Sequence, residues 1–122
     1  MENTEKLTDH KPDINLDIFY SLEVKFCLIE EVEDVLKNPK KPFDVTENPV
    51  KGYKLSIDTG TEKRDVFTNI YDKFTKEQLK GQVTTFVLNL PAALIRGVNS
   101  RGMIVMTDNA LVSGGKKGDI LI

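Results

Sequence analysis

The sequence predicts an all-β domain in which one short helix lies between the third and fourth of five strands. Three observations support this class. Apolar and polar residues alternate in several short segments, turn residues separate these segments, and one segment carries a clear helix start. The chain has 122 residues, one cysteine and no tryptophan. At this length a single hydrophobic core suffices without disulfides or metals.

The N-terminal residues 1–15 are polar and follow neither apolar period. We therefore expect a flexible arm over 1–15 and a folded domain over 16–122. The arm carries His10, and a histidine in such a segment is typical of a solvated surface, because no partner that would orient it as a base is in sight.

The first strand is predicted within residues 19–32. Its apolar residues alternate with polar ones, which is the pattern of a half-buried strand; they are Leu22, Val24, Phe26 and Leu28. Cys27 falls in the polar phase of this pattern. We therefore expect a partly exposed thiol without a catalytic role, since the sequence supplies no identifiable histidine base for it.

A long loop is predicted over residues 37–49, because this segment holds three prolines and no periodicity. Loops of more than a dozen residues are uncommon in compact domains and are often functional. Two readings stay open: a basic flap that carries Lys37, Lys40 and Lys41 over a ligand, or a solvated loop without a role.

A hairpin is predicted next, with strands over 53–58 and 64–70 joined by a turn at 59–62. Thr75 followed by Gln78 has the spacing of a capping box, so a helix of barely two turns should begin there and end at Gly81. Residues 82–90 and 103–106 complete the predicted strands.

This count of elements favours a small, closed Greek-key barrel of the OB type, with five strands and its one helix between strands three and four. An SH3-like barrel is the structural rival. The position of the helix favours the OB arrangement, because that architecture places its helix after the third strand, at the bottom of the barrel.

The net charge of −2 hides an uneven distribution of charge along the chain. Residues 16–36 carry six acids and one lysine, and such a segment should repel phosphate. Residues 37–64 carry seven bases and four acids, and residues 91–122 carry four bases and two acids. Either ordinary surface charge or a phosphate-binding surface accounts for these two basic segments.

Sequence motifs for catalysis are missing from the chain: it has no nucleophile elbow, no phosphate-binding P-loop and no zinc-protease motif. One cysteine and one histidine cannot form a tetrahedral zinc site. The apolar runs are far shorter than a membrane span, and the N-terminus has no basic leader. We expect a cytoplasmic protein that is not an enzyme, does not enter the membrane and uses neither cofactor nor metal.

The segment 94–103 places two glycines among polar and basic residues. Gly97 and Gly102 would let a ligand approach the backbone, and Arg96 and Arg101 could supply the charge-assisted hydrogen bonds that phosphates favour. A plain tight connection with scattered arginines is the other reading.

These residues resemble a known family. The runs Tyr-Lys-Leu-Ser-Ile-Asp-Thr-Gly at 53–60 and Arg-Gly-Val-Asn-Ser-Arg-Gly-Met at 96–103 are similar to the tRNA-binding OB domains that include the C-terminal appendix of methionyl-tRNA synthetase and the CsaA-type proteins. The resemblance covers about residues 16–122. It implies an OB fold, tRNA as the partner and a symmetric homodimer.

The resemblance also implies which residues contact RNA. Asn-Pro-Val-Lys at 48–51 aligns with the family's Asn-Ala-Asp-Lys motif, so Asn48 and Lys51 match two of its RNA-contacting positions. Ser100 and Met103 match a serine and a methionine of the binding face. Pro49 and Val50 replace the Ala-Asp pair, Gly52 replaces the usual leucine, and the loop before Asn48 is longer than in the family.

The leading hypothesis is a non-catalytic module that recognises folded tRNA by shape and phosphate contacts on one barrel face. Lys51, Lys54, Arg96 and Arg101 would neutralise phosphates. Asn48 and Ser100 would hydrogen-bond sugars or base edges, and Met103 would pack against a ribose or a base. Two alternatives remain: a CsaA-like export chaperone that binds unfolded peptides in an apolar groove, and a module that docks onto an aminoacyl-tRNA synthetase.

Overall fold

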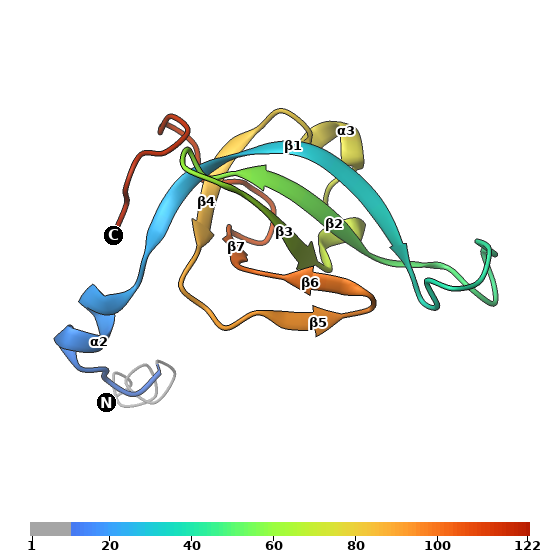
Figure 1. Ribbon diagram of the computed structural model, residues 1–122, viewed down its shortest axis with the longest axis horizontal. Coiled ribbons are helices and arrows are strands. Elements are labelled where there is room, and N and C mark those ends of the chain that lie inside the picture. Colours follow the sequence, from blue (N-terminus) through green and yellow to red (C-terminus); the bar gives the residue numbers. More distant parts are fainter. Residues whose placement is uncertain (1–10) are drawn as a thin grey trace, which may run out of the picture.

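A five-stranded antiparallel sheet, ordered β3-β2-β1-β4-β7, forms the body of the protein in a computed structural model that describes residues 11–122 (Figure 1). Its strands are β1 (Val24–Leu36), β2 (Val50–Asp58), β3 (Lys63–Thr68), β4 (Val83–Val87) and β7 (Met103–Val105). Strands β5 (Ala93–Ile95) and β6 (Val98–Ser100) form a separate ribbon. Most of the predicted arm, including His10, lies outside the described residues.

Strand β1 is long enough to belong to both halves of the sheet. Its first part pairs with β4 and its second part pairs with β2, so the strand arches over the body (Figure 1). The β1–β2 register shifts between Ile29 and Glu31, just past Leu28, the last residue of β1 that pairs with β4, and such a bulge bends a strand and increases its twist. This curvature lets a single sheet wrap around one core.

The core lies inside the curved sheet. Its fully buried side chains come from every large strand and from the short helix α3 (Lys76–Leu79); they are Ile29, Leu55, Ile57, Val66, Leu79 and Phe86. Leu79 packs into this core from α3, which lies between β3 and β4 as the sequence predicts. The all-β, OB-like class is therefore confirmed.

The predicted closure of the barrel by a continuous ladder is not present among the described residues, because β3 and β7 stand at the two ends of the sheet. Single contacts span this seam instead. The amide of Arg101 donates to the carbonyl of Asp65 (2.9 Å), and the amide of Phe67 donates to Ser100 Oγ (3.0 Å). In place of a strand ladder, these side-chain and loop hydrogen bonds connect the two ends of the sheet.

The helix predictions are partly confirmed. The capping box is present, with the Gln78 amide donating to Thr75 Oγ1 and the Thr75 amide donating to Gln78 Oε1. A second helix, α2 (Leu16–Ser21), was not predicted, because residues from 19 onward were assigned to the first strand. Asn15 explains this helix, since its Oδ1 accepts the amide of Asp17 at 2.7 Å as an N-cap.

The predicted exposure of Cys27 is wrong. Cys27 and Ile29 face the core, whereas Phe26 on the opposite phase is covered by the C-terminal segment, whose Gly115 packs against its ring. The backbone of Asp119 accepts the amide of Phe26, which holds that segment in place. Both faces of β1 are therefore buried here, and burial raises the pKa of the Cys27 thiol to about 11.

Candidate nucleic-acid interface

The predicted 37–49 loop joins β1 to β2 and projects from one end of the molecule (Figure 1). Asn48 holds its two arms together. Its Oδ1 accepts the amide of Asn38 at 2.7 Å, and its Nδ2 lies within hydrogen-bond distance of the carbonyls of Asn38, Lys41 and Pro42, at 2.8 to 3.1 Å. The side chain is 4% exposed, so its polar atoms serve the loop itself.

A second set of contacts fixes the turn at the loop tip. Asp44 accepts the amides of Thr46 and Glu47 at 2.8 and 3.0 Å, and these bonds lower the pKa of the Asp44 carboxyl. The backbones of Asp44 and Asn48 pair with each other, and the amide of Lys37 donates to the carbonyl of Pro49 at 2.8 Å. The loop therefore has a defined shape although it contains no regular ladder.

The β5–β6 hairpin supports the base of this loop. Arg96 and Gly97 form its two-residue turn, both with positive φ (49° and 85°), as a type I′ connection requires. Arginine is an unusual residue in this conformation, which favours glycine and asparagine. Its Nη1 donates to the carbonyl of Lys37 at 2.6 Å, and Gly97 lies against Pro39. The two basic segments of the sequence meet at this contact.

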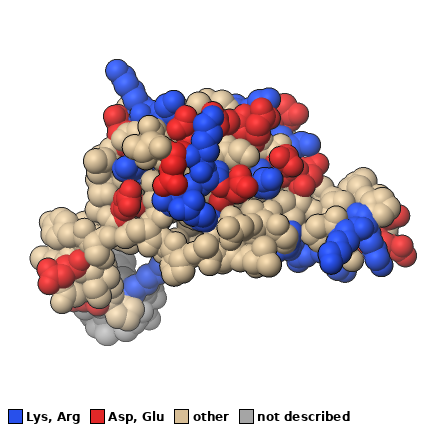
Figure 2. Space-filling model, viewed as in Figure 1, with Lys and Arg blue, Asp and Glu red and all other residues tan. Residues whose placement is uncertain are grey.

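The acidic residues at the end of β1 do not form an open negative surface. Each faces a lysine from a neighbouring element: Glu30 with Lys63 (2.9 Å), Glu31 with Lys80 (3.2 Å), Glu33 with Lys54 (3.9 Å) and Asp34 with Lys76 (3.1 Å). Figure 2 accordingly shows red and blue side chains interleaved on the body of the molecule. The repulsion of phosphate that the sequence suggested for this segment is reduced by these partners.

The same pairing involves two of the predicted RNA ligands. Lys54 lies 3.9 Å from both Glu33 and Asp65, and Arg101 lies 3.5 Å from Glu62. A phosphate has to displace these carboxylates or bind beside them. Lys54 and Arg101 are thus placed on the body of the domain as ion-paired residues, with less free charge than the sequence suggested.

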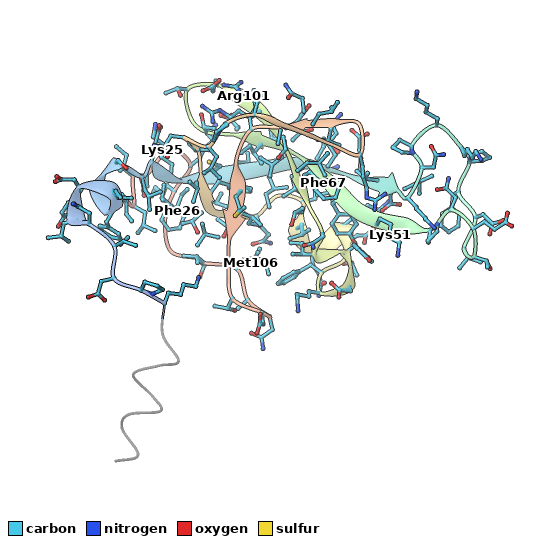
Figure 3. All side chains as sticks on the ribbon, turned by 90° about the horizontal axis from the view of Figure 1, so that it is seen from below. Lys25, Phe26, Lys51, Phe67, Arg101 and Met106 are labelled. Atoms are coloured by element: carbon cyan, nitrogen blue, oxygen red, sulfur yellow. The ribbon has the colours of Figure 1, made fainter. Side chains whose placement is uncertain are left out.

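Unlike Lys54 and Arg101, the bases around the projecting loop have no carboxylate partner in the part of the chain that the structure describes. Within residues 11–122, five of them form no ion pair and lie on or beside the loop: Lys37, Lys40, Lys41, Lys51 and Arg96. Figure 2 shows the lysines gathered on the loop, and Figure 3 places Lys51 at the loop end of β2, well away from Arg101. This set is here called the loop-base cluster; the loop also carries two carboxylates, Asp44 and Glu47.

Ser100 and Met103 lie on the other side of the predicted site. Ser100 is buried, and its hydroxyl accepts the amide of Phe67. Met103 begins β7 and is 58% exposed. The structure therefore places Arg96 and Lys51 beside the loop, whereas Met103 and Arg101 lie on the body of the domain. The side chains of Asn48 and Ser100 form hydrogen bonds within the protein. Their contacts with RNA stay predictions.

Sequence reasoning missed two residues of interest. Phe43 is an exposed aromatic residue on the loop. The sequence could have indicated it, because an aromatic residue between prolines is unusual in a segment predicted to be a solvated or basic loop. Arg64 is nearly buried beneath the β6–β7 connection, where its Nη1 donates to the carbonyl of Leu88 and its Nη2 pairs with Glu62 at 2.8 Å. Neither position follows from sequence spacing alone.

Comparison with known proteins bears on this site directly. Residues 45–122 match the model of the family described as "Putative tRNA binding domain". The chain belongs to this family. A methionine–tRNA ligase of Methanococcus aeolicus is 36% identical over 92 residues, which are 75% of this chain and 12% of that protein. The chain thus spans about an eighth of such a ligase.

Two solved structures share the fold of this family member. A MetRS-related protein from Pyrococcus horikoshii superimposes with a TM-score of 0.69 at 26% identity, covering 92% of this chain and all of that one. A CsaA chaperone protein from Picrophilus torridus gives a TM-score of 0.68 at 22% identity, covering 90% of this chain and all of that one. The predicted family resemblance is confirmed.

The described residues offer no metal site or membrane-spanning helix, and a second basic segment is already engaged within the domain. Across residues 11–122, no three histidine, cysteine, aspartate or glutamate side chains gather in a way that could hold a metal ion. In the same residues no helix is long and apolar enough to cross a membrane. The basic turn at 113–118 makes its contacts within the domain. Asp119 accepts the amide of Lys116, and Lys117 forms an ion pair with Asp58 at 3.1 Å. The candidate nucleic-acid interface is therefore the loop-base cluster, whose bases form no ion pair within the described residues.

Proposed function

We propose that this domain is a non-catalytic module that binds folded tRNA through phosphate contacts centred on the loop-base cluster. The observation that carries the proposal is that lysines and an arginine without ion pairs, from two distant segments of the chain, lie on or beside one ordered loop in a member of a tRNA-binding family. Free, converging positive charge of this kind attracts a phosphate backbone and positions it.

The proposed contacts follow the geometry. Lys51 and the guanidinium of Arg96 flank the loop and would bind phosphates first, because neither has a carboxylate partner among the described residues. Lys54 and Arg101 would extend the contact along the barrel by exchanging a carboxylate for a phosphate. Met103, exposed on β7, would pack against a ribose or a base. The cytoplasm, where tRNA is found, is the proposed compartment.

A salt titration tests this proposal. If about four phosphates are neutralised, the affinity for unfractionated tRNA should fall about 100-fold between 50 and 200 mM salt. A single-stranded oligonucleotide of the same length should compete poorly, because the module is proposed to recognise folded RNA. Binding that does not change with salt would contradict the phosphate-contact mechanism.

We also propose that the chain forms a homodimer through α2 and the C-terminus. Several large apolar side chains there are exposed in the single chain; they are Leu16, Ile18, Tyr20, Ile120 and Leu121. An apolar surface of this kind is typical of a protein interface. Light scattering should give twice the chain mass for the native protein and a single chain mass for Ile18→Asp.

A second candidate function has one specific observation in its favour. Leu94 is 77% exposed on β5 and Met103 is 58% exposed on β7, so apolar side chains are available to contact an unfolded peptide, as the chaperone hypothesis requires. Charge reversal separates the functions: Lys40→Glu with Lys41→Glu should abolish tRNA binding, whereas peptide binding on β5 and β7 should persist. Capture of an aminoacyl-tRNA synthetase by the native domain would instead support the docking hypothesis.

A further inference from the structure

The projecting loop carries an aromatic side chain that its own structure does not use. Phe43 is 61% exposed, and within residues 11–122 its ring has no aromatic partner. The bonds that order the loop come from Asn48, Asp44 and the backbone, so the ring contributes little to holding that shape. An exposed aromatic on an ordered loop loses little conformational entropy when it binds a flat ligand.

The ring lines a pocket of about 560 Å³ within the loop. Its apolar wall consists of Pro39, Pro42 and Phe43, and its polar lining includes Lys37 and Lys41. A nucleobase has flat apolar faces and polar edges, and its nucleotide carries a phosphate. The pocket therefore combines the surfaces that an unstacked nucleotide needs, namely a stacking face and nearby ammonium groups.

The carboxylates of the pocket do not oppose this ligand strongly. Asp44 already accepts two amide hydrogens, so its charge is partly compensated. Glu47 lies on the pocket wall and can accept a hydrogen bond from the amino group of a base. With Lys37, Lys40 and Lys41, the loop offers more positive than negative charge to a phosphate.

The position of these residues in the fold adds further support. The loop lies at the edge of the barrel, where the Arg96 guanidinium donates to the carbonyl of Lys37 and Lys51 follows directly on β2. A nucleotide bound in the loop would therefore lie next to the proposed phosphate contacts.

We propose that the 37–49 loop is a preformed receptor for one unpaired nucleotide of the bound RNA. The base stacks on Phe43 against Pro39 and Pro42, while Lys37 and Lys41 hold the adjoining phosphate. Folded tRNA offers unstacked nucleotides in its loops and at its 3′ end, whereas a continuous duplex offers none. The inference rests on the proposed tRNA binding and names the part of the RNA that this loop reads.

The absence of tryptophan from the chain gives a direct test. Phe43→Trp introduces a single indole at an exposed position, and a base stacked on it should quench its fluorescence. Titration with unfractionated tRNA should quench this emission saturably, with the same Kd as fluorescence anisotropy of labelled tRNA. Ile14→Trp, just before α2 at the opposite end of the molecule (Figure 1), is the matched control and should not be quenched.

Affinity measurements complete the test. Phe43→Ala should weaken tRNA binding about tenfold without changing the salt dependence, and Phe43→Tyr should restore the affinity, because the contact is stacking and carries no charge. Val45→Ala, at a neighbouring position that is 79% exposed, is the control and should bind as the native chain does. A blunt-ended RNA duplex should bind native and Phe43→Ala proteins equally.

The outcomes separate the two proposals. Suppose that the native chain binds tRNA in a salt-dependent way, that tRNA leaves the indole emission of Phe43→Trp unchanged, and that Phe43→Ala binds with native affinity. The nucleotide receptor is then overturned and the proposed function stands. If the native chain does not bind tRNA at low salt, both are overturned. Quenching of the Phe43→Trp indole by an unfolded peptide, with none by tRNA, would overturn the nucleotide receptor in favour of a peptide site.

Discussion

Replacing Asn48 with alanine should loosen the β1–β2 loop and weaken RNA binding as a consequence. In the native chain the Asn48 carboxamide accepts one backbone amide and lies against three backbone carbonyls across the loop. Its NH₂ group has two hydrogens, so the three carbonyls share two donors. The side chain therefore contributes about three hydrogen bonds in a nearly solvent-free position.

The expected magnitude follows from this count. A net contribution of about 1 kcal/mol for each hydrogen bond gives about 3 kcal/mol for the ordering of the loop. The global free energy of unfolding should fall less, by about 1 to 2 kcal/mol, because an opened loop exposes its carbonyls to water while the barrel core stays intact. The affinity for tRNA should fall about tenfold, because the ordered cluster of lysines is lost.

Two measurements test this reasoning together. Hydrogen exchange should show faster exchange of the Asn38 amide, which donates to Asn48 Oδ1, and urea unfolding should show the loss of stability. Asn48→Asp is the matched control of nearly the same size. Its carboxylate retains the acceptor but places negative charge against three carbonyls, so at neutral pH it should disturb the loop at least as much as alanine does.

The result also decides between two roles for Asn48. A residue that orders the loop changes hydrogen exchange, stability and affinity together. A residue that contacts RNA directly, as the family resemblance implies, changes affinity alone. Native exchange and stability in Asn48→Ala, with weakened tRNA binding, would refute the structural argument.

Three further predictions concern other parts of the molecule. Gly52→Ala should cost about 1 to 3 kcal/mol of unfolding free energy in urea, because a β-carbon there would lie 2.5 Å from the Phe67 ring; unchanged stability would show that the ring moves freely. Arg96→Asn should keep the thermal midpoint, because asparagine suits the turn, but should reduce tRNA affinity severalfold; native affinity would remove Arg96 from the interface. The pKa of Asp58 is lowered by the Gly60 amide and Lys117, so its stabilisation is present above the usual carboxyl pKa and lost as pH falls below about 4. Urea unfolding of Asp58→Asn should therefore show a smaller loss of stability between about pH 5 and 3 than that of the native chain, and an equal loss would refute the assignment.

Local patterns in the sequence predicted much of the fold. Period-two alternation located the central strands, and the spacing of Thr75 and Gln78 located α3, because both signals depend on neighbouring residues only. The register of β1 was harder to predict. Cys27 was assigned to the exposed phase, since the sequence does not show that the C-terminal segment folds back over Phe26 and buries the second face.

The sequence by itself determined the sign of charge in each segment and the presence of a long proline-rich loop before Asn48. Only the tertiary structure decided which charges are free. Lys54 lies opposite Glu33 in the β1–β2 register, and Arg101 meets Glu62 across the seam of the barrel, so these bases are paired. Arg96 instead reaches Lys37, 59 residues earlier in the chain, and keeps its charge. Because Coulomb interactions depend on distance in space, charges far apart in sequence neutralise or reinforce one another only once the sheet has set their positions.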